Sequence, residues 1–439
     1  MGGLAAIAKS LDHKVTGCDT SVYPPMSTQL GELGIDIIDG WEPDQLALGA
    51  DCYIVGNAVS RGNPLMEAIL DKNLPYESGP QWLYNNVLYS KWTLGVAGTH
   101  GKTTTTAMLT KILDYAGLEP GFLIGGAPVD FEVTSRISES NFFVIEADEY
   151  DTAFFDKRSK FVHYRPKTLV LNNLEYDHAD IFPNLSAIEV QFHHLLRTVP
   201  QSGGLIVNAD SSALSRVLKR GYWSSLTLFG PKAPWSIEKP SGQDDVEILH
   251  EGACVGTFSP KFFGDHNLDN ALAALLAARH CGVPISTGLE ALSEYNGVRR
   301  RMELRAAINN ISIYDDFAHH PTAISATVSA LREDDPEARI LAVFEPRSNT
   351  MKMGTNSSAL IRSLAKADSV YCFSQDIAWD ASALFRPLGE RARVVSEIDL
   401  LTDMIVNDSR EGDKILIMSN GGFHGIHGKI IEKLRANTR

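Results

Sequence analysis

Short apolar runs that end in polar or glycine-rich loops alternate along the chain with segments of helical periodicity. Alternation of this kind predicts α/β domains, each built on an open and mainly parallel sheet with helices on its faces. The pattern changes its local character twice, and we expect domains at residues 1–90, 91–298 and 299–439. A chain of 439 residues also agrees with about three domains of ordinary size.

The first segment is predicted to begin with a helix, which is followed by a strand that ends at Asp19. A second apolar strand, DCYIVGNA, ends in a polar loop around Asn57. A nucleotide-binding α/β half normally opens with a strand and a glycine loop, of which only Gly2 and Gly3 are present here. We therefore expect a Rossmann-like sheet that lacks its first strand.

The second and third segments have clearer strands, and each strand ends in a loop of polar residues. Residues 201–262 depart from the alternation, because their short alternating runs predict a small antiparallel patch. The third segment is predicted to form a second open parallel sheet. The expected strands and helices are WTLGVA, FFVIEAD, TLVLNN and the helix LDNALAALLAARH in the second segment, then ISIYDD, RILAVFEP, SVYCF, KILIMSN and the helix TAISATVSALRE in the third.

Composition and charge exclude several classes of protein. The net charge of −14 argues against nonspecific nucleic-acid binding, which needs a basic surface. No apolar run approaches the roughly 20 residues that span a bilayer, so no membrane association is expected. The five cysteines are scattered and form no C-x-x-C pair, which predicts inert, mostly buried thiols in a reducing, cytoplasmic compartment.

The strongest local signal follows the strand WTLGVA, where a glycine loop leads into a helix rich in threonine. A strand, a glycine turn, Lys-Thr and a helix predict a phosphate-binding loop, although Val96 stands where the general pattern has its first glycine. Lys102 is expected to reach the β- and γ-phosphates, and Thr103 to ligate Mg²⁺. The loop residues are Gly98, Thr99, His100, Gly101, Lys102, Thr103 and Thr104.

Acidic and amide side chains follow the next two apolar strands. Glu146, with Glu149 close behind it, follows FFVIEAD, while Asn173 and His178 follow TLVLN. Because the carboxyl ends of neighbouring parallel strands meet at one edge of a sheet, we expect these side chains to converge on the phosphate loop. Glu146 is the first choice as a metal ligand, Glu149 is the alternative, and His178 is expected at a second metal position.

Four further positions are candidates for ligand binding. Asn270 lies at the start of a predicted helix, where helix capping and recognition of a base are equally good interpretations. Arg301 belongs to a run of three arginines, and it could close onto a γ-phosphate. Asp316 and Arg347 each follow a strand of the third segment, and Arg347 could hold a carboxylate with two hydrogen bonds.

The ordered set of motifs resembles the Mur ligases over essentially the whole chain. These motifs are GTHGKTTT, EADE, NNLEYDHAD, GDHNLDNALAA, RRRMEL and DDFAHHPTA. Further stretches, among them FFDKRSKFVHYRPK, EPRSNTMKMG and MSNGGF, are similar to the murein peptide ligases of the family rather than to its alanine ligases. The resemblance implies a three-domain architecture in which a Rossmann-like domain, a central P-loop ATPase domain and a second Rossmann-like domain follow one another.

The resemblance also implies the activity and its residues. ATP and Mg²⁺ would serve a ligase that joins UDP-N-acetylmuramate to the tripeptide L-alanyl-γ-D-glutamyl-meso-diaminopimelate during peptidoglycan recycling. The muramate carboxylate would attack the γ-phosphorus, and the acyl phosphate would then meet the free amine of the tripeptide. The third domain would close over the reaction and exclude water. The implied catalytic residues are Lys102, Glu146, His178 and Arg301, with Thr103, Glu146 and His178 at the metal positions.

The remaining residues are assigned to the nucleotides and substrates. In the family's arrangement Asn270 would meet the adenine, Arg301 the γ-phosphate and Asp316 the ribose side of ATP. The uridine diphosphate would face Asp19 and Asn57, and the substrates would also contact Asn173 and Arg347. Residues 179–200 contain no lysine, so we expect none of the carbamylated lysine that several Mur ligases use to bind metal.

Three other functions compete with this interpretation. A UDP-N-acetylmuramate–L-alanine ligase of primary wall synthesis is the alternative within the same class of enzyme, but the C-terminal motifs argue against it. A nucleotide-dependent switch would need only the phosphate loop, and it leaves the third domain without a role. A dinucleotide dehydrogenase is suggested only by Asp19 at a strand end, and the lack of a G-x-G-x-x-G motif weakens it.

Overall fold

The computed structural model describes residues 1–20, 22, 26–240, 245–353, 357–375 and 377–437. Its backbone divides into two compact units, each of which is described by itself. Unit 1 comprises Met1–Glu175, Ser186–Ser259 and Asn270–Tyr295, and unit 2 comprises Tyr176–Leu185, Pro260–Asp269 and Asn296–Arg439. Both units combine helices with parallel-rich sheets, which confirms the predicted α/β class.

Within its described residues, unit 1 is built on a ten-stranded sheet of order β16-β15-β14-β13-β12-β11-β5-β8-β6-β7. The strands from β13 to β6 are parallel, and β7, β15 and β16 run antiparallel to their neighbours. The bounds are β5 (Trp92–Ala97), β6 (Gly121–Leu123), β7 (Ser135–Arg136), β8 (Phe142–Glu146), β11 (Thr168–Leu171), β12 (Gly204–Asn208), β13 (Ser225–Phe229), β14 (Trp235–Glu238), β15 (Val246–His250) and β16 (Ala253–Phe258).

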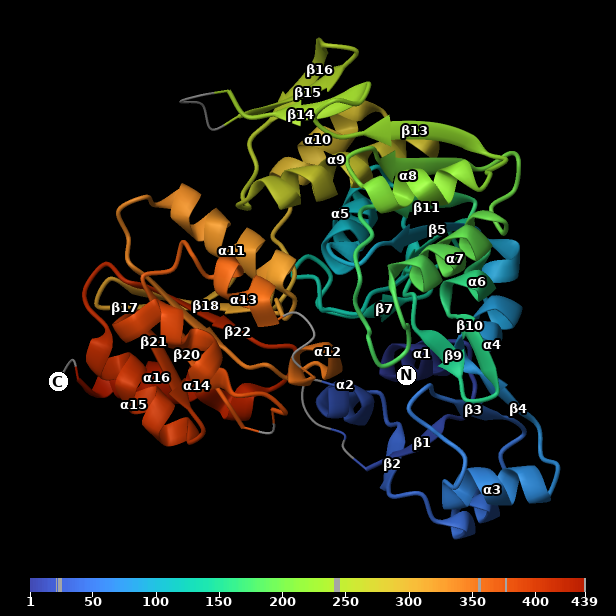
Figure 1. Ribbon diagram of the computed structural model, residues 1–439. Helices are drawn as coiled ribbons and strands as arrows, with labels where there is room; N and C mark the ends of the chain where they lie inside the picture. Colours follow the sequence, from blue (N-terminus) through green and yellow to red (C-terminus); the bar gives the residue numbers. More distant parts are fainter. Residues whose placement is uncertain (21, 23–25, 241–244, 354–356, 376, 438–439) are drawn as a thin grey trace. The chain divides into compact units, whose positions relative to one another are not determined.

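The middle of this sheet places the phosphate loop. The strand β5 lies between β8 and β11, and all three are apolar because both faces of the sheet are covered. The helix α5 packs on β5 and β8, where the buried hydroxyls of Thr106 and Thr110 donate to carbonyls one turn earlier, at 2.8 Å each. The helices of this region are α5 (Lys102–Tyr115), α6 (Phe161–Tyr164), α7 (Leu185–Leu196), α8 (Ser212–Lys219), α9 (Asp265–His280) and α10 (Ile285–Ser293) (Figure 1).

The N-terminal part of unit 1 differs from the single sheet that we expected. Its short strands form two separate parallel pairs, because β1 hydrogen-bonds to β2 and β3 to β4 in the described residues. The elements are α1 (Gly2–Ser10), β1 (Thr16–Asp19), α2 (Met26–Glu32), β2 (Asp36–Asp39), η1 (Pro43–Leu48), β3 (Tyr53–Val55), α3 (Pro64–Asp71), β4 (Tyr76–Ser78), α4 (Gly79–Asn86) and η2 (Leu88–Ser90).

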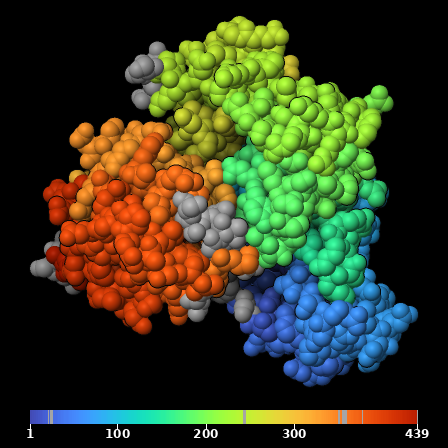
Figure 2. Space-filling model, in the orientation of Figure 1, coloured from blue at the N-terminus to red at the C-terminus, as the bar shows by residue number. Residues whose placement is uncertain are grey.

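A short hairpin joins the N-terminal part to the large sheet. Its strands are β9 (Asp151–Ala153) and β10 (Asp156–Ser159), and Phe154 at its tip packs against the apolar cluster of the N-terminal part. The buried ring of His163 on α6 contacts Gln81 on α4, with 2.9 Å between Nδ1 and Oε1. The guanidinium of Arg165 lies over the ring of Tyr84. In Figure 2 the N-terminal part, drawn in blue, lies beside green residues from the middle of the chain.

Unit 2 contains a six-stranded sheet among its described residues, with the order β17-β18-β22-β19-β20-β21. The sheet is parallel as predicted, except for an antiparallel edge strand, β17, that the sequence did not predict. The residues of β17 are mixed and half exposed, so they give no apolar run. The strands are β17 (Glu303–Ile308), β18 (Ile311–Asp316), β19 (Ile340–Phe344), β20 (Ser369–Phe373), β21 (Ala392–Val395) and β22 (Lys414–Met418).

Apolar clusters lie on both faces of this sheet, between the strands and the helices that cover them. The helices are α11 (Pro321–Asp334), α12 (Asn349–Lys352), α13 (Ser357–Ser363), α14 (Ala381–Phe385), η3 (Arg386–Arg391), α15 (Ile398–Asp408), η4 (Phe423–Gly425) and α16 (Ile426–Ala436). None of the helices in the described residues is long and apolar enough to cross a membrane. The expectation of buried thiols is wrong for Cys52 and Cys254, which are exposed, and it holds for Cys372.

Candidate functional site

The phosphate loop has the backbone that its glycines predict. Gly98 and Gly101 have φ angles of +149° and +78°, and α5 begins directly after Gly101. A Cβ on Gly101 would lie 2.3 Å from Oδ1 of Asn270, so only glycine fits there. The first amides of α5 have no intrahelical acceptor, and together with the helix dipole they form an anion-binding end.

Lys102 is buried at the start of α5, and its ammonium group is surrounded by oxygen atoms. Its Nζ lies 2.6 Å from the carbonyl oxygen of Gly98, 3.1 Å from Oε2 of Glu149 and 3.7 Å from Oδ1 of Asp148. Burial lowers the pKa of Lys102, but the carboxylates of Glu149, Asp148 and Glu146 raise it by more, so the net pKa lies above the ordinary value. The lysine therefore stays charged at the mouth of the phosphate loop.

Glu146, at the end of β8, is bound to the residue that follows Lys102. Its Oε1 accepts a hydrogen bond from Oγ1 of Thr103, and its Oε2 accepts one from the amide of Gly125, at 2.8 Å each. Burial and the nearby Asp148 raise the pKa of Glu146, while Lys102 and the two hydrogen bonds oppose this shift. A hydroxyl and a carboxylate at this distance are oxygen donors that suit Mg²⁺. Glu149 pairs with Lys102, and Glu146 with Thr103.

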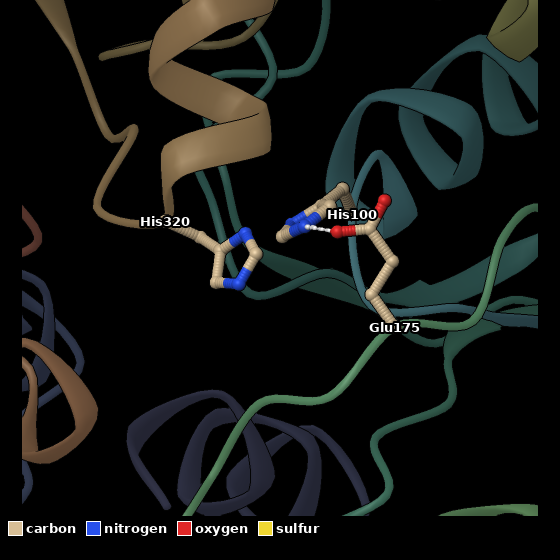
Figure 3. Close-up of side chains that lie close together, drawn as sticks. All are labelled: His100, Glu175 and His320. Carbon is tan, nitrogen blue, oxygen red and sulfur yellow. Dashed lines mark ion pairs between the residues drawn. The ribbon is translucent and has the colours of Figure 1, made fainter. Parts of the chain in front are cut away.

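The loop after β11 holds the phosphate loop from one side. The side chain of Asn173 accepts a hydrogen bond from the amide of His100 at 2.8 Å and donates one to its carbonyl at 3.1 Å. The amide of Thr99 donates to the carbonyl of Asn173 at 3.2 Å, and its hydroxyl accepts from the amide of Glu175 at 2.9 Å. Figure 3 shows the ion pair of His100 with Glu175, whose Nε2 and Oε2 atoms are 3.6 Å apart.

Asn270 does not cap its helix, because α9 begins at Asp265. Its buried Oδ1 instead accepts hydrogen bonds from Oγ1 of Thr105 at 3.0 Å and from Nδ2 of Asn172 at 3.2 Å. The helix-capping interpretation is therefore wrong, and Asn270 lies behind the phosphate loop. The sequence analysis missed Asn172 and Thr105 in this network, although Asn172 also stands at the end of an apolar strand and could have been chosen on that ground.

The other metal candidate, His178, belongs to unit 2, whereas Glu146 belongs to unit 1. His178 has a left-handed backbone with φ of +55°, and its amide donates to Oδ1 of Asp177 at 2.7 Å. Burial raises the pKa of Asp177, but His178, His320 and His319 lower it by more, so the net pKa is below the ordinary value. His320, which Figure 3 also labels, caps α11 by accepting from the amide of Thr322. A cluster of histidines around one carboxylate is therefore a feature of unit 2.

Asp316 is buried at the end of β18, and both of its carboxylate oxygens accept backbone hydrogen bonds. The donors are the amides of Met302 and Ala318, each at 2.8 Å. Burial raises the pKa of Asp316, while Arg301 and these amides oppose the shift. The guanidinium of Arg301 lies 4.8 Å from the ring centroid of Phe317. Asp316 thus fixes the turn that carries Arg301.

Arg300, the neighbour of Arg301, donates to the carbonyls of Ser419 and Gly421 at 2.7 Å each. Arg347 also lies against this loop, because a Cβ on Gly421 would lie 2.4 Å from its Cδ. The side chain of Arg347 is 45% exposed, and its Nη1 lies 3.9 Å from Oε1 of Glu345. Arg300 is therefore a structural anchor of unit 2, while Arg347 keeps an accessible cation at the carboxyl edge of the sheet.

The two candidates of the N-terminal part lie on different strand pairs. Asp19 ends β1, accepts from the amide of Thr20 at 2.7 Å and lines a cavity of about 550 Å³ with residues that include Asp39. Asn57 follows β3 and is exposed. The structure thus places Lys102, Thr103, Glu146, Asn173 and Asn270 together in unit 1, beside the loop of Gly98, Thr99, His100 and Gly101 and the first turn of α5, which holds Thr104. It places His178, Arg301, Asp316 and Arg347 in unit 2.

Three models of known protein families match most of the chain. Residues 1–88 match the model described as Mur ligase family, catalytic domain; residues 96–278 match Mur ligase middle domain; and residues 300–421 match Mur ligase, glutamate ligase domain. These three matches span the N-terminal strand pairs, the phosphate loop with its acidic partners, and most of the unit 2 sheet.

Individual relatives match over nearly their whole length. The UDP-N-acetylmuramate–L-alanyl-γ-D-glutamyl-meso-2,6-diaminoheptandioate ligase of Escherichia coli strain K12 is 51% identical over 437 residues, 99% of this chain and 96% of that protein. A UDP-N-acetylmuramate–L-alanine ligase of Solibacter usitatus is 29% identical over 456 residues, 100% of this chain and 94% of that protein. The crystal structure of a murein peptide ligase from Psychrobacter arcticus has a TM-score of 0.76 and 40% identity, and the match covers 99% of this chain and 96% of that one.

The phosphate loop with its buried lysine, the three matched segments and the full-length relatives agree with one another. The chain belongs to the Mur ligase family, and it is an ATP-dependent ligase that forms an amide bond.

Proposed function

We propose that this ligase joins UDP-N-acetylmuramate to the tripeptide L-alanyl-γ-D-glutamyl-meso-diaminopimelate in peptidoglycan recycling. The observation that carries the proposal is the 51% identity to the E. coli ligase of that name, which extends over almost the whole of both chains. The identity to an alanine ligase is only 29% over a similar length, which favours the tripeptide over L-alanine as the amine.

The site in unit 1 fits the triphosphate of ATP. A phosphate on the amides at the start of α5 would face the buried ammonium of Lys102, which three nearby carboxylates keep charged. Because the γ-phosphoryl group meets an anionic carboxylate in this reaction, a cation at this place reduces the repulsion between them. Gly101 leaves room for Asn270 behind the loop, so the loop can hold its shape while it binds the nucleotide.

Glu146 and Thr103 are the residues that would hold Mg²⁺, because their side-chain oxygens already lie 2.8 Å apart beside the loop. When bound, Mg²⁺ supplies positive charge that stabilises the phosphate oxygens. His178 is the residue that we assign to a second metal position. Glu149 is assigned to Lys102 rather than to the metal, because its carboxylate lies 3.1 Å from Nζ.

The remaining tasks are divided among the three segments. Residues 1–90, with Asp19 and Asn57, would bind the UDP-sugar; residues 91–298 would bind ATP; and residues 299–439 would close on ATP and bind the peptide. In the last segment Arg301 is assigned to the γ-phosphate, Asp316 to the ribose side and Arg347 to a carboxylate of the tripeptide. Arg347 suits this role because it presents an accessible guanidinium.

The reaction that follows from these assignments has two steps. The muramate carboxylate attacks the γ-phosphorus of ATP to give an acyl phosphate and ADP, and the amine of the tripeptide then displaces phosphate to form the amide. Water has to be excluded between the steps, because it would hydrolyse the acyl phosphate. Both ATP and UDP-sugars are cytoplasmic metabolites, and the free, unpaired cysteines suit the same compartment.

The test compares two amine substrates under the same conditions. ADP release is measured with UDP-N-acetylmuramate plus the tripeptide and, separately, with the same sugar plus L-alanine. We expect turnover with the tripeptide and at most a small fraction of that rate with L-alanine. Turnover with L-alanine alone would contradict the recycling role and favour the alanine ligase, while turnover with neither amine would contradict both.

A further inference from the structure

We propose that Asn173 is a positioning residue that fixes the phosphate loop for ATP, and that it does not bind the sugar or peptide substrate. This inference deepens the proposed function, on which it rests. It replaces the assignment of Asn173 to the substrates that the family resemblance implies, and it is carried by the hydrogen bonds that Asn173 makes.

The carboxamide of Asn173 makes hydrogen bonds to one residue of the loop through both its oxygen and its nitrogen. Its Oδ1 accepts from the amide of His100 at 2.8 Å, and its Nδ2 donates to the carbonyl of His100 at 3.1 Å. These two groups belong to successive peptide planes, so one side chain fixes the orientation of both. A carboxamide carries a donor and an acceptor side by side, whereas a carboxylate has no donor and an aliphatic side chain has neither.

The backbone on either side of Asn173 continues the same contact. The amide of Thr99 donates to the carbonyl of Asn173 at 3.2 Å, and a Cβ on Gly98 would lie 3.2 Å from that oxygen. The hydroxyl of Thr99 accepts from the amide of Glu175 at 2.9 Å and lies 3.4 Å from its carbonyl. The segment from residue 173 to 175 is thus fastened along the loop from residue 98 to 100.

These bonds determine which loop amides can meet a phosphate. The amides of Thr99 and His100 are both directed to Asn173, one to its main chain and one to its side chain. The phosphate-binding amides are then those from Gly101 onward, where α5 begins and Lys102 projects. Loss of the carboxamide would free the two peptides around His100 and shift Gly101 and Lys102 relative to the phosphates. The variant would therefore bind ATP more weakly.

The test uses the full-length chain with Asn173→Ala, and with Glu175→Gln as the matched control. Initial rates are measured while ATP and UDP-N-acetylmuramate are varied in turn, and ATP-induced thermal stabilisation is measured without the other substrates. For Asn173→Ala we expect a KM for ATP that rises about tenfold or more, as the loss of two hydrogen bonds implies, with an unchanged KM for the sugar. The stabilisation by ATP should weaken in parallel.

Glu175→Gln keeps the backbone bonds to Thr99 and removes the charge that faces His100. We expect its KM for ATP to stay close to that of the wild type. A raised KM for the sugar with an unchanged KM for ATP in Asn173→Ala would overturn the proposal and make Asn173 a substrate ligand. No change in either constant would also overturn it.

Two further measurements keep the test decisive. If Asn173→Ala does not fold, Asn173→Asp replaces it, because aspartate keeps the acceptor for the amide of His100 and loses the donor to the carbonyl of His100. A raised KM for ATP is again expected for this variant. An unchanged KM for ATP would contradict the proposal. If the wild type shows no sugar-dependent and tripeptide-dependent ADP release, the proposed function fails. Stabilisation by ATP alone still tests Asn173 in that case.

Discussion

Oδ1 of Asn270 lies 2.3 Å from the place that a Cβ on Gly101 would occupy. The two residues are far apart in the sequence, and their contact ties the turn before α5 to the helix α9 behind it. Gly101 also has a φ of +78°, which is a left-handed conformation that disfavours other residues.

Gly101→Ala is therefore expected to lower the free energy of unfolding by more than the backbone strain of alanine at this φ would lower it. Gly117→Ala is the matched control, because Gly117 has a φ of +74° with no atom within 4 Å of the added Cβ. We expect about 1–2 kcal/mol of destabilisation for the control and a larger loss, with a raised KM for ATP, for Gly101→Ala. Thermal unfolding and initial rates measure both effects, and equal losses of stability in the two variants would show that the contact with Asn270 is unimportant.

Lys102→Met should strongly slow the ligase reaction, although it approximately preserves the length of the side chain. The ammonium lies against the phosphate loop at the start of α5, so its removal is expected to reduce the rate of ADP release by about 10²-fold or more. Lys72→Met, which changes an exposed lysine at the end of α3, should leave the rate unchanged. A Lys102→Met variant that retains the wild-type rate would refute the assignment of the phosphate loop.

Glu146→Gln should raise the concentration of Mg²⁺ that gives half-maximal activity. The carboxylate is the charged member of the pair with Thr103, and loss of a metal ligand or its support commonly weakens metal affinity about 10–100-fold. Glu139→Gln, at an exposed position of the same unit, should not change the Mg²⁺ dependence. If Glu149→Gln shifts the Mg²⁺ dependence and Glu146→Gln does not, the roles of the two carboxylates are reversed.

His163 should make the stability of unit 1 depend on pH. Burial lowers the pKa of His163 below its ordinary value of 6.5, Arg158 and Arg165 lower it further, and Asp156 opposes them. A histidine with a lowered pKa takes up its proton more readily in the unfolded chain, so stability is lost as pH falls through about 6.5 toward the folded pKa.

Thermal unfolding at about pH 7.5 and about pH 5.5 measures this loss. His163→Gln keeps a polar side chain toward Gln81 and removes the titration, so its unfolding temperature should fall less between the two pH values than that of the wild type. An equal fall in both proteins would mean that His163 makes no contribution to the pH dependence.

The central elements of the fold could be predicted from the sequence because they are periodic and locally determined. The strand WTLGVA is β5 with unchanged bounds, and the antiparallel patch after residue 201 is present as β15 and β16. The edge strand β17 was not predicted, because its residues are mixed in type and half exposed, and they form no continuous apolar run. The N-terminal sheet is divided into two pairs, which no local pattern could reveal.

The same distinction applies to the candidate site. Lys102 and Thr103 are recognised from a contiguous motif, and Glu146 from its position at the end of a neighbouring strand. Asn173 contacts His100 across 73 residues of sequence, and such a contact depends on the register of β11 beside β5. An asparagine at a strand end suggested that Asn173 binds a substrate, whereas the hydrogen bonds of its side chain are made to the phosphate loop.

The most direct test of the whole account measures the coupling of ATP consumption to the product. The chain is incubated with ATP, Mg²⁺, UDP-N-acetylmuramate and the tripeptide, and ADP and the UDP-muramoyl-tripeptide are quantified by mass spectrometry. We predict equal amounts of ADP and of a product whose mass is that of the two substrates less one water, and neither without the tripeptide. ADP formation without this product, or an equally efficient product with L-alanine, would contradict the account.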